Sequence, residues 1–200
     1  MITENGLYPA EHRGLRELHA MTRQLAGHWT KLARKLGGAP AGPLERGAAA
    51  AMEMLPELDE RTAAYDLHGT PAAQGVGGGM ARVRGGGDLM LERNQALRGA
   101  VLDAEHVTTL LAYLASLAEH RGDADLVEWL RGWELRLRAA QSEVRATVVA
   151  LGAEPDAAIE PADTGRLGRA GHSLAAGLGS LGEALDGSVV GRAARRARRG

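Results

Sequence analysis

One carboxylate and one imidazole stand at a spacing that suits metal binding. Asp103 and His106 are three residues apart. In a helix, residues three apart lie on the same face, so both side chains can ligate one ion. The structural alternative is a polar pair at the edge of the core, in which the two side chains bond to each other or to Arg98.

Further carboxylates fall on or beside the apolar stripes of neighbouring segments. Glu92 shares the stripe of Asp103, and Glu11 continues the stripe of an N-terminal segment. Asp59 and Glu134 border the stripes of two other segments. If these segments pack as helices around one axis, the candidate ligands are Glu11, Asp59, Glu92, Asp103, His106 and Glu134.

Other catalytic chemistry finds little support in the residue types. The chain has no Cys, which excludes a thiolate nucleophile, a disulfide framework and a cysteine-held metal cluster. No Ser-His-Asp arrangement is discernible, and the Gly-rich run 76–87 lacks the Lys-Ser/Thr ending of a phosphate-binding loop. The sequence therefore favours a protein that is not an enzyme and needs no cofactor.

Composition also bears on location and on partners. Residues 1–9 lack the basic start and apolar run of a signal peptide. No stretch approaches the roughly 20 apolar residues that cross a bilayer. The net charge of −1 argues against wholesale nucleic-acid binding. We therefore expect a cytoplasmic protein without specific nucleic-acid recognition.

Apolar residues recur at steps of three and four in four segments, which is the spacing of one helix face. The pattern predicts helices over residues 9–37, 43–67, 88–121 and 123–151. Pro56 falls inside the second helix and is expected to kink or divide it.

The last helix carries the cleanest pattern, and its tryptophans differ in position. Trp133 and Leu137 lie on the stripe, whereas Trp129 lies to one side of it. We expect the first two to be buried and Trp129 to be partly exposed.

The lengths of the connections predict the topology. Short loops join the first helix to the second and the third to the fourth, and short loops force antiparallel neighbours. The Gly-rich linker 69–87 is long enough to run the length of a bundle at about 3.3 Å per residue. The predicted fold is all-α: an antiparallel four-helix bundle over residues 1–152 with one long crossover. A linker at 153–165 and a C-terminal tail at 166–200 follow.

The stretch LDAEHVTTLLAYLASLAEHRGDADLVEWLRGWELRLRAAQSEVRATVVALG, residues 102–152, resembles the second hairpin of small bacterial ferritin-like proteins. The shared features are an acidic-His pair, a Gly-Asp turn and an acidic helix. The resemblance implies a Glu on each of two helices and a Glu-x-x-His on each of the other two, with iron or manganese bound between them. Leu137 stands three residues after Glu134, so the second Glu-x-x-His is missing.

Two functions follow from this partial match. The first is a non-catalytic ferritin-like bundle that acts through association, as a homo-oligomer. The alternative is a ferritin-like metal-binding or iron-oxidising protein with a partly degenerate carboxylate and His site.

The tail combines an apolar stripe with a cluster of cations. Its Leu residues stand at steps of four, three and four, and interspersed Gly residues make a helix there dependent on contact with a surface. Five Arg follow, with no acid after Asp186. The residues expected to make contact are Leu174, Leu178, Leu181, Leu185, Arg192, Arg195, Arg196, Arg198 and Arg199.

Several partners fit that composition. The tail is expected to dock on its own bundle or on a second subunit. An anionic membrane surface is an alternative, since weak apolar contact and several Arg can suffice. The run GLGSLGEAL at 177–185 also resembles the short tails by which ferritin-like cargo is captured in bacterial protein shells. A basic tail that touches nucleic-acid phosphates is the remaining possibility.

Overall fold

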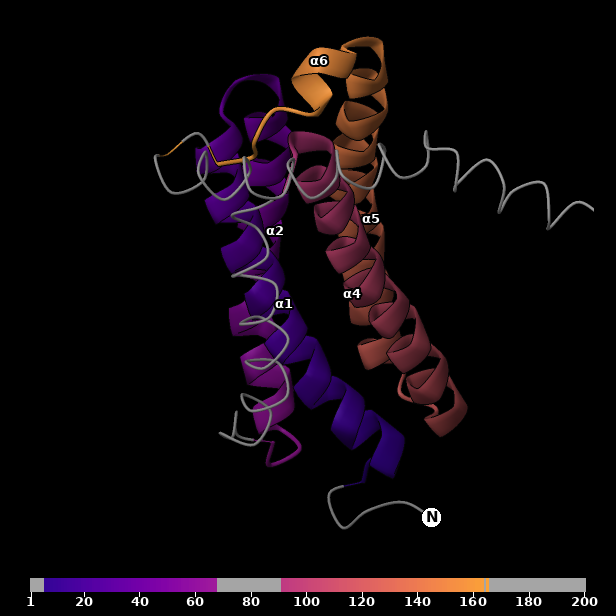
Figure 1. The fold of residues 1–200 in the computed structure, drawn as a ribbon. Helices are drawn as coiled ribbons and strands as arrows, with labels where there is room; N and C mark the ends of the chain where they lie inside the picture. Colours follow the sequence, from indigo (N-terminus) through magenta and orange to yellow (C-terminus); the bar gives the residue numbers. More distant parts are fainter. Residues whose placement is uncertain (1–5, 68–90, 164, 166–200) are drawn as a thin grey trace, which may run out of the picture.

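The computed structural model describes residues 6–67, 91–163 and 165. Four long helices form a bundle, as Figure 1 shows: α1 (Pro9–Leu36), α2 (Gly38–Ala63), α4 (Arg93–Arg121) and α5 (Ala124–Ala150). A single 3-10 turn, η1 (Leu151–Ala153), and a short helix, α6 (Pro155–Ala158), follow α5. The predicted all-α fold is confirmed.

Every pair of adjacent long helices is antiparallel. The helices α1 and α2 form one hairpin, α4 and α5 form the other, and α1 packs on α4 while α2 packs on α5. Glu11 at the start of α1 contacts Arg121 at the end of α4. Near the other end, the indole of Trp29 donates to the carbonyl of Ala100 at 3.2 Å.

The connection between the two hairpins starts at one end of the bundle and finishes at the opposite end. The chain leaves α2 beside the α4–α5 turn, where the hydroxyl of Tyr65 donates to Asp123 at 2.8 Å. It resumes beside the end of α1, where the guanidinium of Arg93 donates to the carbonyl of Leu36 at 3.1 Å. The predicted crossover is therefore confirmed by its two ends, and residues 68–90 themselves lie outside the described part of the chain.

The second helix begins earlier than predicted and is not divided. It starts at Gly38, with only Gly37 between it and the end of α1. Pro40 therefore falls in its first turn, where a missing N–H costs no helical hydrogen bond. Pro56 lies on an exposed side of α2. The carbonyl that this proline leaves without a helical donor can therefore bond to water, and α2 continues to Ala63.

The third helix begins at Arg93 rather than at residue 88. Glu92 is its N-cap, and the Glu92 N–H donates to the side chain of Gln95 in a capping box. Residues 91–93 pair with 160–162 through two backbone hydrogen bonds, Arg93 N–H to the Glu160 carbonyl and Ala162 N–H to the Leu91 carbonyl. This pairing holds the chain extended up to the cap.

The core is aliphatic apart from two tryptophans. Trp29 is wholly buried, and Trp133 and Leu137 are buried as predicted. Trp129 is only partly buried, which is also as predicted. Among the described residues, no helix is long and apolar enough to cross a lipid bilayer.

Candidate functional site

The six candidate metal ligands are spread along the bundle rather than gathered at one point. Glu11, at one end, accepts the backbone N–H of Tyr8 at 2.8 Å and pairs with Arg121. Glu92, at the opposite end, caps α4 and accepts the side-chain amide of Asn94 at 2.8 Å. Both carboxylates therefore serve helix termini.

Asp103 and His106 both turn toward α1 and not toward each other. The Oδ2 atom of Asp103 lies 2.6 Å from Nδ1 of His28, and both side chains are largely buried. Nε2 of His106 lies 3.0 Å from Oε1 of Glu17 at a half-exposed position. The spacing of three residues places both side chains on the side of α4 that faces α1. They do not bond to each other, because each bonds to its own partner on α1.

The two remaining candidates also have separate partners. Asp59, exposed on α2, lies 2.8 Å from Nε2 of His19. Glu134 pairs with Arg138 one turn later in α5, at 2.7 Å. Within residues 6–67 and 91–163, no three or more His, Asp or Glu side chains stand close enough to hold a metal ion.

A partly buried network closes the bundle at the α4–α5 turn. Arg121 contacts Glu11 at 3.1 Å and Asp123 at 2.9 Å, and Tyr65 donates to the same Asp123 oxygen. Asp123 also caps α5 by accepting the backbone N–H of Leu126 at 3.0 Å. The network therefore ties together the start of α1, the end of α2 and the turn between α4 and α5.

Burial and hydrogen bonding oppose each other in this network. Burial alone disfavours the charged form of Asp123, but bonds from the Leu126 N–H, Tyr65 and Arg121 outweigh it, so the pKa of Asp123 is lowered. Burial raises the pKa of Tyr65. The network thus places the guanidinium of Arg121 between the carboxylate groups of Glu11 and Asp123, beside the phenol of Tyr65. These contacts hold helix ends together.

A second cluster joins α2 to α5 between the core and the surface. Glu57 accepts both indole N–H groups, from Trp129 at 2.7 Å and from Trp133 at 2.9 Å, and these bonds lower the pKa of Glu57. Arg61 and Arg136 lie over the two indole rings, 5.1 and 4.8 Å from the ring centroids. The sequence analysis did not connect these residues, because the contacts join different helices and leave no spacing signal within either one.

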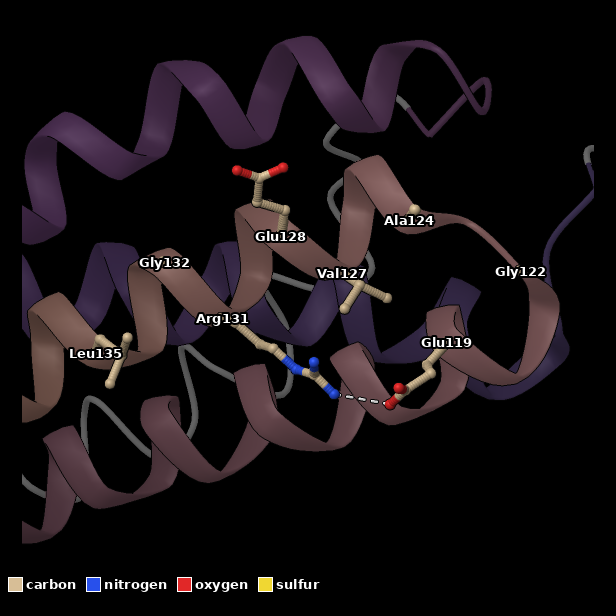
Figure 2. A pocket seen from close by; sticks show the side chains of 8 residues that line it. All are labelled: Glu119, Gly122, Ala124, Val127, Glu128, Arg131, Gly132 and Leu135. Atoms are coloured by element: carbon tan, nitrogen blue, oxygen red, sulfur yellow. Dashed lines mark hydrogen bonds and ion pairs between the residues drawn. The ribbon is translucent and has the colours of Figure 1, made fainter.

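An open groove of about 590 Å³ lies on the outward side of the α4–α5 hairpin. Figure 2 shows its lining, with Arg131 of α5 reaching across to Glu119 of α4; these two side chains are 2.7 Å apart. Leu135, at one end of the groove, is 70% exposed. The lining residues are Glu119, Gly122, Ala124, Val127, Glu128, Arg131, Gly132 and Leu135.

The groove continues into an uncharged strip along α5. Leu135 and Val149 are large exposed apolar residues, 70% and 68% accessible. Steps of four, three, four and three along α5 lead from Leu135 to Val149, and the exposed positions reached between them carry only small side chains. We call this set the outer stripe; it consists of Leu135, Ala139, Ser142, Ala146 and Val149. It was missed in the sequence because the core stripe of α5 has the same period and larger side chains.

The tail residues from Leu174 to Arg199 lie outside the described part of the chain, so their predicted contacts remain predictions. No protein-family model, no curated protein and no solved structure matches this chain.

Proposed function

We propose that this protein is a non-catalytic helical bundle of ferritin-like architecture that acts through association, with a second copy of the chain as its partner. The architecture is supported by the two antiparallel hairpins and by the connection between opposite ends of the bundle, an arrangement found in ferritin-like folds.

The outer stripe of α5 is the observation that carries the proposal. Helix α5 contains eight charged residues, yet none of them falls on the outer stripe between Leu135 and Val149. Exposed helix faces are normally where charged residues collect. An uncharged stripe opposite the core stripe therefore favours a helix that packs on two surfaces.

The buried ionisable groups support structure rather than chemistry. Glu11 is engaged by the N–H of Tyr8 and by Arg121, and Asp103 is engaged by His28. Removal of one partner from such a buried pair is strongly destabilising. These groups therefore fit a structural role within the bundle.

The test is the mass of the full chain in solution across a concentration series. We expect sedimentation equilibrium to give a mass above one chain at high concentration. The double variant Leu135→Glu with Val149→Glu should remain a single chain, because its outer stripe is charged. Met52→Glu is the matched control, since Met52 is a large exposed residue on α2, 52% accessible, and lies off the outer stripe. Association that survives the double variant would contradict the proposal.

Metal binding is the second candidate, and one contact favours it. The carboxylate of Asp103 and the imidazole of His28 meet at 2.6 Å inside the bundle, between two helices. A carboxylate and an imidazole are suitable ligands for iron or manganese. Metal analysis, described in the Discussion, decides between the two candidates.

A further inference from the structure

The apolar residues of the tail match the outer stripe of α5 in length. Val149 and Leu135 are 14 residues apart, about 21 Å along a helix axis. In the tail, Leu174 and Val189 are 15 residues apart, about 22 Å if the segment is helical. Both stripes also repeat at steps of three and four. A helical tail therefore has apolar side chains to cover the whole outer stripe.

The place where the described chain ends sets the direction of such a tail. Asp163 lies 3.2 Å from Lys35, and Pro161 pairs with Glu92, so the chain leaves at the end of the bundle where α4 begins. Eight residues, 166–173, precede Leu174, and they reach about 26 Å when extended. That distance spans two or more helix–helix spacings of about 10 Å. It does not reach the α4–α5 turn, about 40 Å away along α4.

Leu174 can therefore pack near Val149, and the tail then runs antiparallel to α5. In this register Val189 lies near Leu135, and the terminal arginines, 192–199, lie about 4 to 15 Å farther along. The groove at that level contains Glu119, Glu128 and one cation, Arg131, which pairs with Glu119. Asp125 follows the lining residue Ala124 along α5. When the apolar residues of the tail pack on the outer stripe, the terminal arginines thus lie beside the carboxylates of the groove.

We propose that residues 174–199 dock on the outer stripe and groove of their own chain. Small side chains on both surfaces, Gly177 and Gly182 in the tail and Ala139 and Ala146 in α5, let two helices approach closely. This inference deepens the proposed function, because the tail covers the surface through which two copies associate. A second copy must displace the tail, so the tail limits self-association.

Engineered cysteine pairs test the docking in the full chain, which has no cysteine of its own. The matched pairs are Val149→Cys with Leu174→Cys, and Leu135→Cys with Val189→Cys. The crossed pair Val149→Cys with Val189→Cys and the distant pair Met52→Cys with Val189→Cys are controls. The rate of disulfide formation within one chain is measured in dilute protein under mild oxidation by non-reducing electrophoresis.

We expect the matched pairs to close at least about tenfold faster than both controls, because docking raises the local concentration of one thiol at the other. Equal rates for all four pairs would overturn the proposal. Matched disulfides that form only between two chains would also overturn it, and would show that the tail docks on a second copy.

Reversing one charge in the groove tests the contact of the tail arginines separately from the apolar contact on the outer stripe. Glu128→Arg should slow closure of the Leu135→Cys, Val189→Cys pair several-fold, whereas Glu45→Arg, an exposed site on α2, should leave the rate unchanged. An unchanged rate in Glu128→Arg would overturn the acidic contact. Docking of the tail is measured by disulfide formation within one chain, whereas self-association is measured by the mass in solution. Either proposal can therefore fail without the other.

Discussion

At the scale of single residues, the buried ring of Trp29 explains why position 47 is a glycine. Its ring is wholly buried between helices, and its N–H donates to the carbonyl of Ala100. A Cβ atom at Gly47 of α2 would overlap ring atoms of Trp29 and would lie 3.3 Å from the Cβ of Ala140. Glycine weakens a helix interior, so its presence here is explained by the close approach of the indole.

Gly47→Ala should therefore destabilise the protein although alanine is the better helix former. The gain in helix propensity is at most about 1 kcal/mol, whereas overpacking a rigid ring in a core costs about 1 to 3 kcal/mol. Urea unfolding followed by circular dichroism measures the difference in free energy. Gly27→Ala is the control, because nothing lies within 4 Å of its added Cβ. This control should be stabilised by roughly 0.5 to 1 kcal/mol, and a stabilised Gly47→Ala would show that the ring moves freely.

At the scale of helices and turns, Asp123 performs two tasks. It caps α5 through the Leu126 N–H, and it accepts hydrogen bonds from Arg121 and Tyr65. Both tasks favour the ionised carboxylate. The α4–α5 turn is therefore held by a group whose charge depends on pH, in addition to Gly122, which adopts a left-handed conformation with φ of 85°.

Asp123→Asn should reduce the acid sensitivity of folding. The pKa of Asp123 is lower in the folded protein than in the unfolded chain, so the group stabilises the fold above its unfolded pKa. That contribution is lost as pH falls through the folded pKa, in a window below about pH 4. Asn keeps the cap but not the charge, so the variant should lose about 1 to 3 kcal/mol at neutral pH and show a shallower decline on acidification.

The measurement is the free energy of unfolding between neutral and acidic pH. Asp125→Asn provides a matched control in the same helical turn, because Asp125 is exposed. Identical acid profiles for Asp123→Asn and the parent chain would mean that the network at the α4–α5 turn contributes nothing to pH dependence.

At the scale of the whole molecule, the residues that follow α5 pack back against the bundle. The last buried apolar residue of the described chain is Ala162, which packs where residues 160–162 pair with the start of α4. Residues 151–163 therefore contact the bundle. The division of the chain into a bundle, a linker at 153–165 and a tail stays a prediction.

A chain that ends at Asp163 should fold. Its helicity by circular dichroism should be close to that of the full chain, and its melting temperature should fall by no more than a few degrees. Loss of a docked tail removes a surface contact rather than core packing, and roughly 1 kcal/mol shifts melting by about 2 to 4 °C in a chain of this size. Non-cooperative unfolding of the shortened chain would place the tail in the core.

Iron loading decides between the two candidate functions. We expect the full chain, after exposure to ferrous iron and removal of unbound metal, to carry well below one ion per chain. The reason is that the six candidate ligands are held by separate partners along the bundle. Stoichiometric iron that is lost in Asp103→Asn but kept in Asp59→Asn would favour the metal-binding function instead.

Periodicity along the chain was sufficient to predict the helices, and the lengths of the connections predicted their pairing and the crossover. Apolar residues at steps of three and four predict helices irrespective of what they pack against, and Gly and Pro between stripes mark their ends. Trp133, Leu137 and Trp129 were placed correctly for that reason. The extension of α2 back to Gly38 was missed, because proline in a first turn looks like a stop signal when read from sequence alone.

Only the tertiary structure decided how the polar side chains are used. The position of a residue on a helix determines the direction in which its side chain points. The axial shift of one helix against its neighbour determines which side chain it contacts. Asp103 therefore meets His28 instead of His106, and Glu57 meets two indoles from α5. The stripe of α5 that faces the core was predicted from its larger side chains, but the exposure of the opposite stripe depends on whether another helix packs there. Packing buries the stripe with Trp133 and leaves the outer stripe from Leu135 to Val149 exposed.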